Sequence, residues 1–121
     1  MKLDIRDLFQ HADGVADYPP FTTIFEEGQP GDCMFVLLEG MVTISIKGVD
    51  VWHIRAGEVF GEMALIDRRP RSASAISRTS VRVARIDEAG FMKLVRDTPA
   101  FSLYMMRLMA KRLRALDETI S

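Results

Sequence analysis

The stretch Gly57-Glu-Val-Phe-Gly-Glu-Met-Ala-Leu-Ile-Asp-Arg-Arg-Pro-Arg-Ser-Ala-Ser-Ala75 decides the fold of this chain. Residues 58–60 have the composition of a short strand, and residues 62–65 that of one helical turn. A polar turn follows over 67–70, and residues 72–77 then alternate small and apolar side chains, as in a strand. The stretch therefore predicts a single helical turn held between two strands.

The side chains around this helical turn predict an anion site. A helix start presents unpaired backbone N–H groups and partial positive charge. Arg71 adds a planar set of donors that matches a phosphate. Glu62 would repel a phosphate, but it suits a neighbouring pair of hydroxyls, such as a ribose edge, as an acceptor. One ligand with an anionic phosphate beside a sugar hydroxyl would satisfy these three features.

The stretch resembles the phosphate-binding cassette of cyclic-nucleotide-binding domains, on the residues Phe60-Gly61-Glu62-Met63-Ala64-Leu65 and Pro70-Arg71-Ser72-Ala73. Such domains occur in the regulatory subunit of cyclic-AMP-dependent protein kinase, in catabolite-activator-type transcription factors and in cyclic-nucleotide-gated channels. The resemblance continues upstream over residues 24–32 and 36–42, and it covers the chain from about Phe21 to the last helix. It is specific, because glycine, acid and arginine all fall at the family's spacing.

The resemblance implies a role for each cassette residue. Glu62 would accept from the ribose 2′-hydroxyl, and Gly61, which lacks a Cβ, would let the backbone approach the sugar. The backbone N–H of Ala64 would donate to the cyclic phosphate, and Arg71 would pair with its charge. The implied ligand-binding residues are Val59, Phe60, Gly61, Glu62, Met63, Ala64, Arg71, Ser72 and Ala73, with Val59, Phe60 and the later part of the last helix as candidates for base contact.

Short strands separated by turn residues fill the chain from Phe21 to Asp87. This pattern is typical of a sandwich or a jelly-roll barrel, and the resemblance implies the barrel. Glu39-Gly40 indicates a tight hairpin, residues 73–77 and 81–86 are expected to pair, and the glycines of the turn over 27–32 are expected to take positive φ. The predicted fold class is mainly β with flanking helices: a double-stranded β-helix, or jelly-roll, barrel with a short N-terminal helix and two C-terminal helices.

The whole chain of 121 residues is predicted to form one cyclic-nucleotide-binding domain. Residues 1–20 form an N-terminal helical segment with a helix over 3–11, residues 21–87 form the barrel with the cassette at 60–73, and residues 88–121 form the hinge and lid helices. Asp87 can cap the first of these helices, 97–99 ends it, and a long helix follows over 101–120. The resemblance implies that this last helix closes over the base, forms a dimer seam, or does both.

Composition favours a soluble cytoplasmic protein. The chain is 48% hydrophobic and 27% charged, with a formal net charge of −1, so no positive field attracts nucleic acid. The single cysteine excludes an internal disulfide and fits a reducing compartment. No apolar run is long enough to cross a membrane, the histidines and Cys33 form no metal-ligand cluster, and no DNA-reading domain follows the last helix.

The predicted function is a sensor that performs no chemistry and needs no cofactor. It would bind cyclic AMP in preference to cyclic GMP, because a serine at position 72 leans that way in the family, and would move the C-terminal helix to act on an unknown downstream protein or a homodimer interface. One alternative is an interaction module of the same fold that binds no nucleotide or another ligand; the other is a metal-dependent cupin enzyme. Arg71 could also be a surface arginine paired with Glu62 or Asp67, Glu62 a helix cap, and Ser72 a packing residue.

Overall fold

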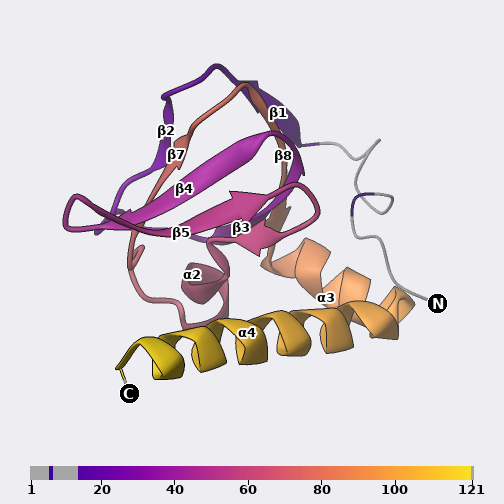
Figure 1. Ribbon diagram of the computed structural model, residues 1–121. Coiled ribbons are helices and arrows are strands. Elements are labelled where there is room, and N and C mark those ends of the chain that lie inside the picture. The colour runs from indigo at the N-terminus through magenta and orange to yellow at the C-terminus, as the bar shows by residue number, and fades with distance from the viewer. Residues whose placement is uncertain (1–5, 7–13, 121) are drawn as a thin grey trace. The chain divides into compact units, whose positions relative to one another are not determined.

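The computed structural model describes residue 6 and residues 14–120, with side chains up to residue 115 (Figure 1). Eight strands and three helices succeed one another in this part of the chain: β1 (Val15–Tyr18), β2 (Thr23–Phe25), β3 (Cys33–Glu39), β4 (Met41–Ile46), β5 (Val49–Arg55), β6 (Val59–Phe60), α2 (Glu62–Asp67), β7 (Ser74–Ser77), β8 (Val81–Asp87), α3 (Glu88–Asp97) and α4 (Pro99–Ile120). The predicted helix over 3–11 lies outside the described residues apart from Arg6, which is helical.

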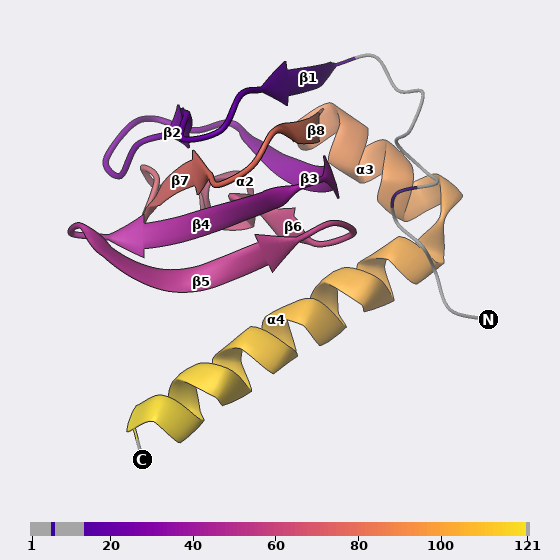
Figure 2. The same cartoon turned by 45° about the horizontal axis from the view of Figure 1, so that its top comes forward.

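The strands form two four-stranded antiparallel sheets within the described residues. One sheet has the order β1-β8-β3-β6 and the other the order β2-β7-β4-β5. Figure 2 shows how the chain passes repeatedly from one sheet to the other. This is the predicted jelly-roll class of fold, and the prediction is confirmed.

Three phenylalanines join the two sheets in the core. Phe25 comes from β2, whereas Phe35 and Phe60 come from β3 and β6 of the other sheet. Their rings stack with centroids 5.8 Å (Phe25–Phe35), 6.1 Å (Phe25–Phe60) and 5.3 Å (Phe35–Phe60) apart. Stacked aromatic pairs stabilise a core beyond their burial alone, so this cluster fixes the positions of β2 and β6 relative to each other.

Two predicted strand pairings are wrong. The sequence predicts a hairpin of β3 and β4 at Glu39-Gly40, but these strands belong to different sheets, as do β7 and β8. Gly40 has a φ of 92°, and a Cβ there would collide with the backbone oxygen of Ser80. The chain therefore uses Gly40 to turn a tight corner between sheets. The turn at Lys47 and Gly48 does form a hairpin, between β4 and β5.

The sequence predicts a helical segment over residues 1–20, and at the end of this segment the prediction is wrong. Residues 15–18 form strand β1, which pairs with β8 along its whole length. Asp17 accepts from Arg82 of β8 at 2.9 Å, and this bond holds the pKa of the Asp17 carboxyl below its usual value. The strand has only four residues with weak alternation, and the Tyr18-Pro19-Pro20 turn follows it directly, so the sequence does not show it.

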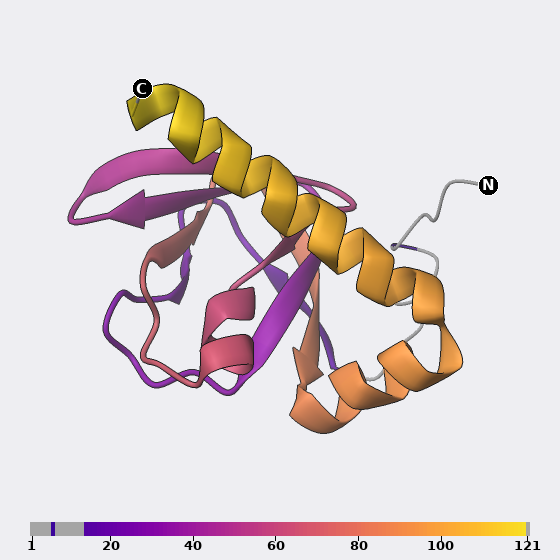
Figure 3. The same cartoon turned by 90° about the horizontal axis from the view of Figure 1, so that it is seen from below.

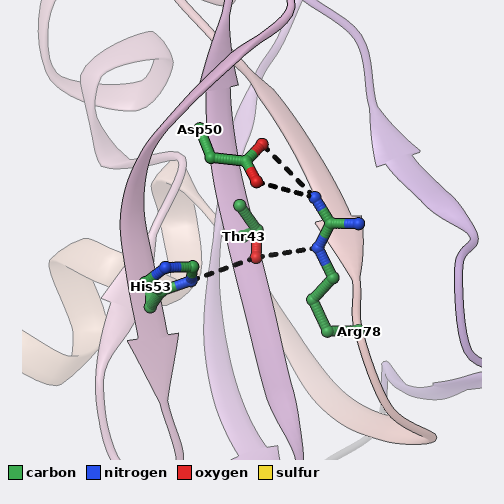
Figure 4. A network of polar contacts seen from close by, with 4 residues as sticks. All are labelled: Thr43, Asp50, His53 and Arg78. Carbon is green, nitrogen blue, oxygen red and sulfur yellow. Dashed lines mark hydrogen bonds and ion pairs between the residues drawn. The ribbon is translucent and has the colours of Figure 1, made fainter.

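A polar network ties β4, β5 and β7 together on the second sheet (Figure 4). The Thr43 hydroxyl, which is fully buried, accepts from Nε of Arg78 at 3.0 Å and lies 3.2 Å from Nδ1 of His53. The same guanidinium donates to both carboxylate oxygens of Asp50, at 3.1 and 3.3 Å. His53 lies on the strand surface, as predicted.

The chain divides into two compact units, with the division between Ala89 and Gly90. In the second unit a sharp bend at Thr98 separates α3 from α4 (Figure 3). Phe101 is fully buried, meets Phe91 edge to face at 5.8 Å and stacks on Tyr104 at 6.4 Å. In the part of the chain that the structure describes, no helix combines the length and apolar character needed to span a bilayer.

Candidate functional site

Gly61 makes the turn between β6 and α2. Its φ is 74°, a left-handed value that suits glycine, and α2 begins at the next residue without a side-chain cap on its N-terminus. A Cβ at Gly61 would lie 2.8 Å from Nη1 of Arg71 and 3.1 Å from the ring of Phe25. A glycine is therefore required here for two reasons, the backbone angle and the close approach of Arg71.

Arg71 lies buried against this turn, with only 6% of its surface exposed. Its Nη1 donates to the backbone oxygen of Gly61 at 2.8 Å, and its Cζ lies 4.3 Å from the centre of the Phe25 ring. Among the described residues, no carboxylate lies within ion-pair distance of Arg71. The interpretation of Arg71 as a surface arginine paired with Glu62 or Asp67 is therefore wrong.

The loop between β2 and β3 holds Arg71 in place. The Arg71 N–H donates to the oxygen of Gln29, and the Gly28 N–H donates to the oxygen of Arg71, each at 2.8 Å. Gly31 lies against the side chain: a Cβ there would come within 2.6 Å of Arg71 Cζ and 2.9 Å of Ala64 Cβ. The expectation of positive φ holds for Gly28, at 88°, but not for Gly31, whose lack of a side chain serves this close contact.

Cys33, the first residue of β3, touches two guanidinium groups. Its sulfur accepts from Arg71 Nη2 at 3.5 Å and from Arg85 Nε at 3.1 Å. Arg85 also donates to Asp32 at 3.2 Å, and the Cys33 sulfur and Asp32 together raise the pKa of Arg85 above its usual value. Cys33 is buried, and nothing in the sequence indicated its contact with two arginines.

The remaining predicted site residues fall into two groups. Met63 and Ser72 are exposed. The others are buried around the same turn: Val59, Phe60, Glu62, Ala64 and Ala73. The structure thus brings the Arg71 guanidinium to Gly61, the residue before Glu62. Gly31 lies against both Arg71 and Ala64. The contact of each of these residues with a ligand stays a prediction.

Sequence reasoning missed three residues of this site: Phe25, Gly31 and Cys33. Phe25 and Gly31 lie inside the motif over 24–32, but a motif read along the chain does not show that this segment folds against Arg71. Elsewhere, a cavity of about 480 Å³ lies along α4, and its described lining consists of Arg107, Ala110, Lys111, Arg114 and Ala115. In the described part of the chain, no three histidine, cysteine or acidic residues gather as metal ligands would.

Comparison with known proteins places this geometry in a family. The family model described as "Cyclic nucleotide-binding domain" matches residues 15–98. The chain is 44% identical over 80 residues to a cAMP-dependent protein kinase regulatory subunit of Aspergillus fumigatus, covering 64% of this chain and 19% of the relative. It is 30% identical over 110 residues to a CRP-like cAMP-activated global transcriptional regulator of Mycobacterium tuberculosis, covering 87% of this chain and 49% of the relative.

The fold agrees with the same family. The chain superposes on the crystal structure of the Thermus thermophilus catabolite activator protein with a TM-score of 0.77 and 28% sequence identity, covering 88% of this chain and 52% of that one. The chain therefore spans from about a fifth to about half of the length of these three proteins.

Proposed function

The chain belongs to the cyclic nucleotide-binding domain family, and on that premise we propose that it binds cyclic AMP, in preference to cyclic GMP, at the turn between β6 and α2. In this proposal Arg71 holds the cyclic phosphate and Glu62 accepts from the ribose hydroxyl. The domain itself carries out no reaction. Its output is a change in the C-terminal helices that a partner protein or a second copy of the chain would detect.

The burial of Arg71 carries this proposal. A buried charge costs several kcal/mol unless it is paired, so folded proteins rarely leave one without a counter-charge. The described partners of the Arg71 guanidinium are a backbone oxygen, the Cys33 sulfur and the rings of Phe25 and Phe35, and none of them is a carboxylate. A cation held this way is available to an anion, and a phosphate supplies the two acceptors that a guanidinium prefers.

Two further features support a nucleotide rather than a free phosphate. Glu62 is buried at the first position of α2, and a carboxylate there would repel an isolated anion but would bind an adjoining sugar hydroxyl. Ser72 and Ala73 follow Arg71 directly, and their hydroxyl and N–H are proposed to complete the shell of the phosphate. The ligands named for the kinase subunit and the transcriptional regulator favour cyclic AMP.

Calorimetric titration of the chain with cyclic AMP and with cyclic GMP tests the proposal. Arg71→Ala is expected to weaken binding by about 2–4 kcal/mol, or roughly 30- to 1,000-fold, because it removes a charge-assisted bidentate contact. Arg69→Ala is the matched control: it removes the same charge from the same loop, at an exposed position, and should leave affinity almost unchanged. Equal affinities for wild type and Arg71→Ala would refute the assignment.

The alternative is an interaction module of this fold that binds no nucleotide or a different ligand. It predicts that neither cyclic nucleotide raises the melting temperature at millimolar concentration, whereas a ligand well above its dissociation constant must do so. The burial of Arg71 without a carboxylate partner among the described residues argues against this alternative.

The proposed output passes through α3 and α4. A ligand can shift the helices only if it binds more tightly to one of their arrangements than to another. The division between the two compact units falls inside α3, next to Gly90, and this is the proposed hinge. Exposed apolar side chains of α4, at Leu103, Met106 and Leu113, are the proposed contact for a second copy. Sedimentation equilibrium with and without nucleotide tests that contact.

A further inference from the structure

One sulfur atom lies between two guanidinium groups at the start of β3. Cys33 is 3% exposed, and its sulfur accepts from Arg71 on one side and from Arg85 on the other. Thiol sulfur is a weak acceptor, much weaker than a carboxylate toward a charged donor. Two guanidinium groups thus share one weak and easily displaced acceptor.

The acidic residue next to this sulfur pairs with only one of the two arginines. Asp32 binds Arg85 at 3.2 Å, at an exposed position where water also solvates both groups. Arg71, the buried arginine, donates to the Cys33 sulfur and to the Gly61 oxygen, and its guanidinium lies over the Phe25 ring. Asp32 therefore pairs with the exposed Arg85, whereas the charge of the buried Arg71 stays available to a ligand.

We propose that Cys33 is a positioning residue for Arg71: its sulfur, a weak acceptor, holds the Nη2 group in place in the ligand-free protein, and the ligand's phosphate displaces it. This inference rests on the proposed role of Arg71 as the phosphate ligand. A carboxylate at position 33 would hold the Nη2 group more firmly, but it would compete with the phosphate for the same donor. An apolar side chain would leave the Nη2 group without its acceptor.

The affinities of three Cys33 variants for cyclic AMP distinguish a weak acceptor, no acceptor and a competing carboxylate at this position. Cys33→Ser keeps an acceptor at this position and is expected to bind within about threefold of wild type, because the serine oxygen can accept from Arg71 as the sulfur does. Cys33→Val keeps the packing but not the acceptor, and should bind about three- to tenfold more weakly. Cys33→Asp is expected to lose at least about tenfold, because its carboxylate forms a charge-assisted pair with Arg71 that the ligand must break.

A double-mutant cycle assigns the loss to the correct arginine. In an Arg71→Ala background, Cys33→Asp should weaken the residual binding by less than about twofold, because the competing pair no longer forms. A comparable loss in both backgrounds would overturn the proposal, as would wild-type affinity in Cys33→Asp.

A measurement without ligand keeps the inference separate from the proposed function. In ¹⁵N-resolved NMR spectra of the free chain, the side-chain Nε–Hε signal of Arg71 is identified by its absence from Arg71→Ala. It should move in Cys33→Val and stay nearly in place in Cys33→Ser, and an unmoved signal in Cys33→Val would overturn the positioning role. If wild type binds neither nucleotide, the proposed function fails, and these spectra still decide whether Cys33 positions Arg71. If Cys33→Asp does not fold, the spectra of Cys33→Val and Cys33→Ser still test the positioning role.

Discussion

At the scale of single residues, Gly31 and Arg71 lie against each other although they come from different loops. A Cβ at Gly31 would meet Cζ of Arg71 at 2.6 Å, closer than real Cβ atoms approach other atoms. The guanidinium is the far end of a flexible side chain, so it would move before the backbone did. Gly31 thus leaves the space in which Arg71 can lie beside Gly61.

We expect Gly31→Ala to weaken cyclic AMP binding by at least about tenfold, because it displaces the proposed phosphate ligand without removing its charge. The backbone angle at Gly31 is not left-handed, so the only strain expected from alanine comes from the contact of its Cβ with Ala64 Cβ, at 2.9 Å. Calorimetric titration measures the affinity, and thermal melting shows that the variant is folded.

Gly28→Ala is the matched control for this prediction. Gly28 has a φ of 88°, and a Cβ added to it would have no other atom within 4 Å. Alanine there should therefore lower stability by about 1 kcal/mol without a contact between its Cβ and the Arg71 side chain. The prediction is contradicted if Gly28→Ala loses as much affinity as Gly31→Ala, since the effect would then come from the loop in general.

At the scale of secondary-structure elements, the network in Figure 4 connects three strands through one buried hydroxyl. Thr43 lies in β4, His53 in β5 and Arg78 just after β7. The hydroxyl accepts from the charged Nε of Arg78. Arg78 is only partly buried, with 34% of its side chain exposed, but a partly buried donor that loses its acceptor still costs stability, so this hydroxyl should stabilise the second sheet.

We expect Thr43→Val to lower the free energy of unfolding by about 1–3 kcal/mol, because valine keeps the shape but leaves Arg78 Nε without its acceptor. Urea denaturation measures the change. Thr23→Val, at an exposed position of β2, is the control and should stay within about 0.5 kcal/mol of wild type. Equal effects in the two variants would show that the network contributes nothing to stability.

The sequence predicted most elements well but predicted poorly which elements pair. The local pattern of apolar segments bounded by turn residues located β3 and β4, and alternation located β8. It could not show that Gly40 turns the chain into the other sheet, because a tight hairpin and a tight corner use the same residue type. β1 was missed since its four residues show too little alternation to be recognised.

The candidate site shows the same limit. The cassette from Phe60 to Ala73 was found from its own residues, because glycine, acid and arginine are close together in the sequence. The contacts of Arg71 with Phe25, Gly31 and Cys33 join segments that are distant along the chain. Local patterns carry no information on such contacts, and only the folded arrangement of β2, β3 and α2 shows them.

At the scale of the whole molecule, the barrel and the C-terminal helices form two compact units. The proposed function requires that occupation of the first unit changes the second. A ligand bound only to the barrel would stabilise the barrel and leave the helices as they were, so the two units must be measured separately.

We expect cyclic AMP to change amide hydrogen exchange in both units of the full chain. Residues 60–73 should become more protected, because the ligand contacts them, and α3 and α4 should change because the hinge near Gly90 responds. Mass spectrometry of exchanged peptides provides the measurement, with Arg71→Ala at the same nucleotide concentration as the control. If exchange changes only before residue 88, the chain binds cyclic AMP without any change in α3 and α4, and the proposed output is contradicted.

The direct passage from β8 into α3 limits how such a signal can travel. Asp87 ends the strand and Glu88 begins the helix, so no loop residue separates them, and the division between units falls at Gly90 within the helix itself. Without a loop between them, the strand and the helix cannot move independently as they would on a flexible linker. If this junction is the hinge proposed above, we expect it to bend by unwinding a turn of helix, where glycine lowers the cost by about 1 kcal/mol relative to alanine. Any crowding, crosslink or helix-promoting solvent that stiffens this turn would then silence the output while occupancy stays unchanged.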